Sequence, residues 1–295
     1  MSERPRYIFL LFSLSIFVLS QAAVLVRWAD APTDVIGFWR MAMTVPILTV
    51  WSLRLGQYKI AAFRSRGLWI RILGCAVFLF LHWRLWFLAV QQTTVANATV
   101  CFALSPLLTA IGALVFFGER IHARLVIAVL LGLTGVVWME WGEFALEGAR
   151  RGDLLGLLST AAFAGYILVS KSIRTRLPNL VFTSVTYGLV GVMFAVCLWA
   201  QGQPFTGYPA STWAALAALT LGPTLLGHAV FTYCLNYLNV NLMTCATLFE
   251  PIFAAIVAAW AFGEPVRLQT VAAFLLVSLG VLILYAPKVS FRTKD

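Results

Sequence analysis

The sequence has little charge and no long polar segment. Only 11% of its 295 residues are charged, whereas 61% are hydrophobic and the mean hydropathy is +0.91. This composition lies far outside the range of water-soluble globular domains. The longest break between apolar windows, residues 54–66, is about a dozen residues long, so no soluble domain fits between them. We therefore expect the chain to lie in a lipid bilayer.

The sequence also lacks the motifs of several enzyme and metal-binding classes. It contains no phosphate-binding loop, dinucleotide fingerprint, nucleophile elbow or HExxH zinc motif, which argues against catalysis and against ATP-driven transport by this chain alone. Its five cysteines lie inside apolar windows, without CxxC spacing and without a nearby cluster of histidines. We expect these cysteines to be small packing residues, and we expect no disulfide, metal site or cofactor.

What the sequence does contain is a nearly continuous series of apolar windows, and a membrane-spanning helix needs roughly 20 apolar residues. The first window follows Arg4 and Arg6, as a secretory signal would, but it is longer than a typical signal core. We predict an all-α, polytopic membrane protein with ten transmembrane helices, at residues 7–26, 33–53, 67–90, 95–117, 121–141, 152–173, 178–200, 210–235, 240–262 and 266–286.

The basic residues predict the orientation of the chain. Although the net charge is +10, Lys and Arg lie in the breaks and at helix ends and form no single stripe, which disfavours a nucleic-acid partner. If the amino terminus is cytoplasmic, fourteen basic residues lie on that side and four on the other, namely Arg27, Arg150, Arg151 and Arg267. The positive-inside rule then places both termini in the cytoplasm.

An internal repeat divides the chain into two halves. At a shift of 145 positions, FALSPLLTAIGALVFFGER (residues 102–120) aligns with TLFEPIFAAIVAAWAFGEP (residues 247–265), which matches Pro106 with Pro251. We expect two five-helix repeats, residues 1–146 and 147–295. Because five is an odd number, the second repeat must enter the membrane from the opposite side, an arrangement typical of secondary transporters.

Three prolines inside the predicted spans are expected to interrupt their helices. Pro106 and Pro251 lie near the middle of the fourth and ninth spans, and Pro223 lies in the eighth. Each lacks an amide hydrogen and its ring clashes with the preceding turn, so we predict helix kinks at these positions. Such kinks free backbone carbonyls, which is tolerable in a membrane only where they face protein or a wet cavity. Packing kinks without ligand contact are the alternative.

These features resemble the drug/metabolite transporter superfamily, in particular its ten-span, EamA-type branch. The resemblance rests on a midspan proline, then Gly-Glu at the helix end, then a glycine-containing span, seen as SPLLTAIGALVFFGER with LLGLTGVV and as EPIFAAIVAAWAFGEP with LVSLGVL. The third span, FLFLHWRLWFLAVQQTTVANATV, is similar to that of bacterial YddG-type exporters of aromatic amino acids. The resemblance implies export of small metabolites across the bacterial inner membrane by alternating access, with the fifth and tenth spans as peripheral supports.

Other cargoes and other classes of protein stay open at this point. Drugs, nucleotide sugars or phosphorylated metabolites are alternative cargoes, although phosphorylated ones need several cavity lysines and arginines and only Arg40 is a good candidate. An intramembrane enzyme that uses Glu250 with a histidine, and a scaffold that transports nothing, are more distant alternatives. The sequence does not decide whether protons are coupled or whether the chain forms a homodimer.

Charged residues inside the spans are the first candidates for substrate contact. Glu250 is the only acidic side chain deep in a span, where a charge costs about 2.5–3.5 kcal/mol, so it should face protein or water. It could bind a substrate ammonium, carry a proton, or brace kinked helices by hydrogen bonds. Arg40 could bind a substrate carboxylate, or it could pair with a carbonyl or with Glu250. Arg84 lies near the end of its span, and we expect it to reach the lipid headgroups.

Aromatic and polar stripes supply the remaining candidates. His82, Trp86 and Phe78 share one helix face, which suits an aromatic substrate, although a structural histidine between helices is an equal reading. At a shift of 146 positions, His82 falls on His228. Stripes on the fourth and sixth spans either face a cavity or join helices by hydrogen bonds. The candidate substrate-binding residues are His82, Trp86, Phe78, Arg40, Asn97, Tyr166, Glu250 and His228.

Overall fold

Helices account for every regular element in the computed structural model, which describes residues 7–58, 63–92, 101–102, 104–140, 150–173, 176–262 and 268–285. No strand occurs among these residues, so the predicted all-α fold is confirmed. The helices are α1 (Ile8–Leu19), α2 (Ala22–Trp28), α3 (Thr33–Arg54), α4 (Arg66–Gln92), α6 (Ser105–Phe117), α7 (Ala123–Glu140), α8 (Arg150–Lys171), α9 (Asn179–Ala200), α10 (Ala210–Leu219), η2 (Thr220–Ala229), α11 (Val230–Cys234), α12 (Val240–Ala246), η3 (Thr247–Phe249), α13 (Glu250–Phe262) and α14 (Leu268–Tyr285).

The lengths of these helices suit a membrane protein. Within the described ranges, six helical segments are long and apolar enough to cross a bilayer, and four shorter apolar helices of 10–17 residues accompany them. Helix limits lie within a few residues of most predicted windows; α9, for example, covers Asn179–Ala200 where we predicted 178–200. The exact number of spans stays a prediction.

Turn residues set several of these limits. Pro32 and Pro178, which match each other in the repeat, both take an extended conformation just before α3 and α9, with φ near −55° and ψ near 143°. A proline there starts a helix without losing a needed amide donor. A glycine sets the C-terminal end of α6. Gly118 has φ 65°, and the amides of Gly118 and Glu119 donate to the carbonyls of Leu114 and Ala113, respectively. The Gly-Glu motif therefore caps a helix.

The three prolines mark breaks in regular helix. Pro106 and Pro251 are each the second residue of a new helix, α6 and α13, so they begin helices where we expected them to bend continuous ones. A proline at this position leaves no intrahelical hydrogen bond unmade. Pro223 lies inside η2, a stretch of π-helix. The spans that carry Pro223 and Pro251 are therefore each built from more than one helical piece or type.

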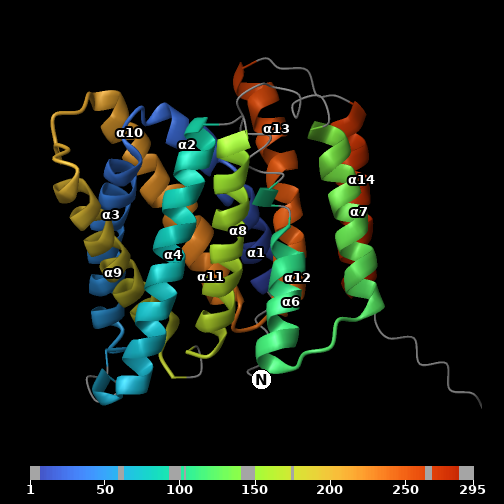
Figure 1. Ribbon diagram of the computed structural model, residues 1–295, viewed down its shortest axis with the longest axis horizontal. Coiled ribbons are helices and arrows are strands. Elements are labelled where there is room, and N and C mark those ends of the chain that lie inside the picture. Colours follow the sequence, from blue (N-terminus) through green and yellow to red (C-terminus); the bar gives the residue numbers. More distant parts are fainter. Residues whose placement is uncertain are drawn as a thin grey trace, which may run out of the picture.

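The two sequence halves pack on each other through equivalent helices. α3 lies along α9, and α7 lies along α14; Figure 1 shows both pairs side by side. The α3–α9 pair is antiparallel, because Trp39 near the start of α3 donates to the carbonyl of Phe205 just beyond α9, whereas Thr49 near the end of α3 bonds with Ser184 near the start of α9.

The helices α7 and α14 contact each other through positions that are equivalent in the sequence repeat. A Cβ added to Gly135 would lie 3.1 Å from the Cα of Ala273, and one added to Gly280 would lie 2.8 Å from the carbonyl oxygen of Ala128. At a shift of 145 positions, Ala128 aligns with Ala273 and Gly135 aligns with Gly280, so each contact joins a glycine of one half to the equivalent alanine of the other. Reciprocal contacts of this kind arise from a twofold axis. They support the predicted inverted halves, which stay a prediction.

The position of α7 and α14 sets them apart from the rest of the bundle. The main hydrophobic core draws its residues from α1–α4, from α8–α12 and from η2, whereas α7 and α14 contribute to two small separate clusters. Figure 1 shows the α7–α14 pair at one edge of the molecule. Space for a central site therefore lies among the other helices.

Candidate substrate site

A cavity of about 50 Å³ lies between helices of the two halves. It contains five of the eight predicted substrate-binding residues, which come from α3, α4, η2 and α13. Around them lie aromatic rings from α4, α8 and α11. The lining consists of Leu19, Ala22, Arg40, His82, Trp83, Trp86, Phe102, Phe163, His228, Phe231, Thr247 and Glu250.

Arg40 brings a buried positive charge to this cavity. Its side chain lies on α3 and is 2% exposed. Nε donates to the hydroxyl of Thr224 at 2.5 Å, and the guanidinium lies 4.8 Å from the ring centre of Trp83 and 5.6 Å from that of Phe87. It forms no other hydrogen bond and no ion pair with a described residue. Aromatic faces attract a cation, but they do not neutralise it.

The π-helix explains why Thr224 is available to Arg40. Pro223 has no amide hydrogen, and its ring crowds the carbonyl of Leu219 one turn earlier. The hydroxyl of Thr224 donates to that carbonyl at 2.7 Å, so its oxygen can still accept from Arg40. The helix break thus creates the hydrogen-bond partner that holds the arginine.

Glu250 supplies the opposite charge from another element. It is the first residue of α13, where the amide groups of a helix N-terminus favour a negative charge. The carboxylate is half-buried and forms no hydrogen bond or ion pair with another described residue. Arg40 and Glu250 therefore line the same cavity without pairing, contrary to one of the roles considered for Arg40.

The two histidines are held in different ways. Nδ1 of His82 lies 2.9 Å from the hydroxyl of Ser159, which also donates to the carbonyl of His82 at 2.9 Å. Nδ1 of His228 lies 2.9 Å from the hydroxyl of Tyr187, and its Nε2 has no hydrogen-bond partner among the described residues. His228 therefore has an unused polar atom, and its side chain is part of the cavity lining.

Aromatic rings close the cavity around these groups. Phe163 on α8 lies 4.9 Å from Phe102, 5.1 Å from His82 and 6.4 Å from both Phe231 and His228, measured between ring centres. Such edge and tilted contacts are the favourable arrangements for aromatic pairs. The wall is thus suited to a planar, apolar group.

Three predicted site residues lie outside this lining. Phe78 is 37% exposed, and its ring packs against Gly165, where an added Cβ would lie 2.7 Å away. Tyr166 lies behind the wall, with its ring 5.5 Å from that of His228 and its hydroxyl 3.2 Å from that of Thr232. Asn97 lies outside the described residues.

The expectation that Arg84 reaches the lipid headgroups is wrong, because its guanidinium pairs with Asp34 at 2.7 Å. The neighbouring helix α3 supplies the carboxylate of Asp34 within hydrogen-bond distance of Arg84. Sequence reasoning also missed three residues around Arg40 and His228, namely Trp83, Tyr187 and Thr224. The proline before Thr224 and the string HWRLW around Trp83 were the available signals.

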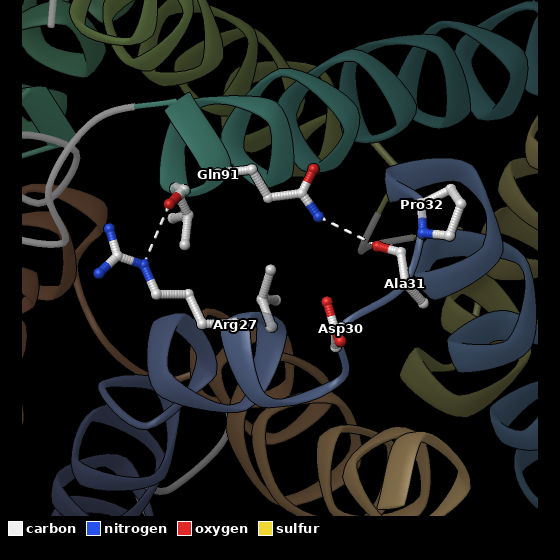
Figure 2. Close-up of a pocket in the computed structure, with 7 residues that line it drawn as sticks. Arg27, Asp30, Ala31, Pro32 and Gln91 are labelled. Atoms are coloured by element: carbon white, nitrogen blue, oxygen red, sulfur yellow. Dashed lines mark hydrogen bonds between the residues drawn. The ribbon is translucent and has the colours of Figure 1, made fainter. Parts of the chain in front are cut away.

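A second hollow of about 450 Å³ lies where α2 and α4 end (Figure 2). Arg27 on α2 donates from Nε to the carbonyl of Val90 at 3.2 Å, and Gln91 on α4 donates to the carbonyl of Ala31 at 3.1 Å. Hydrogen bonds therefore join α4 to α2 and to the α2–α3 connection across this hollow. Asp30 also faces it in Figure 2. No cluster of three or more His, Cys, Asp or Glu side chains that could hold a metal occurs in the part of the chain that the structure describes.

Comparison with known proteins gives a consistent family. The EamA-like transporter family matches residues 6–141 and again residues 150–286. An uncharacterized transporter of Archaeoglobus fulgidus is 27% identical over 72% of this chain and 75% of its own. The aromatic amino acid exporter YddG of Salmonella typhimurium is 27% identical over 60% of this chain and 62% of its own.

A solved crystal structure has the same fold. It aligns with 95% of this chain and 97% of its own with a TM-score of 0.78, at 20% sequence identity. The two matches of the family profile together span nearly all of the chain. The protein is therefore a transporter and no enzyme, and it belongs to the EamA-like transporter family.

Proposed function

We propose that this chain exports small metabolites across the inner membrane, and that its cargo is aromatic and other neutral amino acids. Transport proceeds by alternating access between two inverted five-helix halves, residues 1–146 and 147–295, with both termini in the cytoplasm. The similarity to the YddG exporter supports the cargo class, and the reciprocal α7–α14 contacts support the inverted arrangement.

One observation carries this proposal: Arg40 and Glu250 line the same aromatic cavity and neither has an ionic partner among the described residues. Unpaired charges inside a membrane protein are costly unless a ligand or water meets them. An amino acid carries a carboxylate for the arginine and an ammonium for the glutamate. The rings of Phe163 and Phe231 then offer an apolar surface to its side chain.

The size of the cavity bears on the transport cycle. Its volume of about 50 Å³ is far below the roughly 300–1,000 Å³ of small-molecule sites. The helices around it must therefore separate before an amino acid can enter. The segmented spans that carry Pro223 and Pro251 are the places where such a movement costs least, because the regular hydrogen-bond ladder is already interrupted there.

Uptake into proteoliposomes tests the proposed cargo. Purified protein is reconstituted, and radiolabelled L-phenylalanine is supplied outside vesicles preloaded with unlabelled L-phenylalanine. We expect label to accumulate above the level in protein-free vesicles, and unlabelled L-tryptophan to compete. Equal signals with and without protein would refute amino-acid cargo. Accumulation of a nucleotide sugar in the same vesicles would instead favour the phosphorylated class.

A further inference from the structure

His228 lines the cavity and has a buried ring nitrogen without a hydrogen-bond partner among the described residues. The side chain is 4% exposed and lines the cavity, yet its Nε2 lacks a hydrogen-bond partner within the described residues. Buried polar atoms are almost always paired, because leaving one without a partner destabilises the folded protein. A group that enters the cavity is therefore expected to supply the missing partner.

The hydrogen-bond partner of Nδ1 determines what Nε2 can offer. The hydroxyl of Tyr187 is completely buried, and Nδ1 of His228 at 2.9 Å is its partner in the described part of the chain. If Nδ1 carried the proton, the hydroxyl hydrogen of Tyr187 would have no acceptor. When the tyrosine donates to Nδ1 instead, both groups are satisfied and the proton of the neutral imidazole resides on Nε2. His228, a residue of the cavity lining, then carries an unused hydrogen-bond donor.

Arg40 contributes donors to the same wall. The ring of Trp83 lies 4.8 Å from the Arg40 guanidinium carbon and 5.2 Å from the His228 ring centre, so both groups contact one indole. Thr224, which holds Nε of Arg40, lies four residues before His228 on η2. The terminal nitrogens of the guanidinium keep their hydrogens for another acceptor. Two different elements thus bring positive or donor groups to one end of the cavity.

We propose that Arg40 and His228 form the subsite for the carboxylate of the substrate, and that Tyr187 is a positioning residue that keeps the proton of His228 on Nε2. The proposal rests on the proposed function and adds the orientation of the cargo. Arg40 supplies the charge and the neutral imidazole supplies a directed N–H group, an arrangement that suits a two-oxygen acceptor. Cargo with a free carboxylate is selected over the corresponding amine.

Binding of four related compounds to purified protein tests this subsite. The compounds are L-phenylalanine, L-phenylalaninamide and phenethylamine, of which the last two lack the carboxylate, and 3-phenylpropionate, which lacks the ammonium. Affinities are measured by calorimetry or tryptophan fluorescence. We expect His228→Phe to weaken L-phenylalanine roughly ten- to hundredfold, the range for a hydrogen bond to a charged group, and to weaken phenethylamine less than about twofold.

Two further variants separate a specific role from a structural one. His228→Gln keeps an amide N–H near the position of Nε2, so it should restore most of the selectivity for L-phenylalanine over phenethylamine. Tyr187→Phe removes only the hydroxyl, and it should lower that selectivity in the same direction as His228→Phe. The matched controls are His122→Phe, an exposed histidine outside the cavity, and Tyr208→Phe, whose hydroxyl bonds to the carbonyl of Pro204.

The outcomes distinguish this inference from the proposed function. If the unaltered protein binds L-phenylalanine and His228→Phe weakens the amino acid and the amine by the same factor, the carboxylate subsite is wrong and amino-acid transport stands. The subsite is also wrong if His228→Phe leaves L-phenylalanine binding unchanged. If the unaltered protein binds none of the four compounds, the proposed cargo is wrong and the subsite falls with it.

Discussion

Arg84 donates two hydrogen bonds to the carboxylate of Asp34, from Nε to Oδ1 at 2.7 Å and from Nη2 to Oδ2 at 3.1 Å. Gln201 donates a third, to Oδ2 at 2.6 Å. Asp34 is the second residue of α3, Arg84 lies in the second half of α4, and Gln201 follows α9. This cluster therefore joins the two sequence halves at one end of the bundle. Bidentate pairing of this kind is strong and directional.

The Asp34 cluster predicts a loss of stability when its charge is removed. The Asp34 side chain is 4% exposed and that of Arg84 is 32% exposed. We expect Asp34→Asn to lower the free energy of unfolding by about 1–2 kcal/mol, since Arg84 keeps access to water that partly replaces its partner. Thermal unfolding of the purified protein measures this. The matched control is Asp30→Asn at an exposed position, and an equal shift in both variants would contradict the prediction.

Close packing of α7 on α14 predicts that an added methyl group is harmful at Gly280. A Cβ there would lie 2.8 Å from the carbonyl oxygen of Ala128, and backbone cannot move aside as a side-chain tip can. We expect Gly280→Ala to destabilise the protein by about 1–3 kcal/mol through overpacking. Gly188→Ala is the control, because no atom lies within 4 Å of its added Cβ. Equal unfolding temperatures for the two variants would show that α14 shifts freely.

The helices could be predicted from the sequence because the chain lies in a lipid bilayer. A bilayer forces every lipid-exposed backbone group into an internal hydrogen bond, so an apolar window of span length has few alternatives to helix. Pro32 and Pro178 then set helix starts, and Gly118 sets a helix end, by local backbone geometry. The windows did not show where a span divides, as it does at Pro251 between η3 and α13, because a proline can either bend a helix or begin a new one.

The candidate site was predictable mainly in its polar members, and Trp86 was predicted beside them. Arg40, Glu250 and His228 stand out because polar groups are rare inside spans and need a reason to be there. Tyr187 does not stand out, because aromatic residues are common in spans and tertiary packing decides which of them contacts the site. Phe78 shows the difficulty: it lies one turn from His82 on α4, yet it packs on α8 and is 37% exposed. A helix face inferred from spacing alone is too broad to separate a residue that lines the cavity from one that packs on a neighbouring helix.

Glu250 predicts a charge-selective loss of function. If its carboxylate receives the substrate ammonium, Glu250→Gln keeps the shape but removes the attraction. We expect L-phenylalanine uptake to fall at least about tenfold, and binding of 3-phenylpropionate, which has no ammonium, to stay within about twofold. Glu119→Gln is the matched control, because Glu119 is an exposed partner of Lys171 at the ends of α6 and α8. Parallel losses for both ligands would indicate that Glu250 braces helices instead.

The orientation of the bundle predicts opposite reactivity at two loops. Ser65 precedes α4 and has Arg64 and Arg66 as neighbours, whereas Thr206 lies between α9 and α10 in a loop, residues 201–209, without lysine or arginine. Figure 1 shows these loops at opposite ends of the bundle. By the positive-inside rule, Ser65 faces the cytoplasm and Thr206 faces away from it.

Labelling of intact cells with a membrane-impermeant maleimide measures this orientation. We expect Thr206→Cys to react in intact cells and Ser65→Cys to react only after the membrane is permeabilised, because both positions are exposed on the protein itself. The unaltered chain gives the background from its five cysteines. The reverse pattern would place both termini outside.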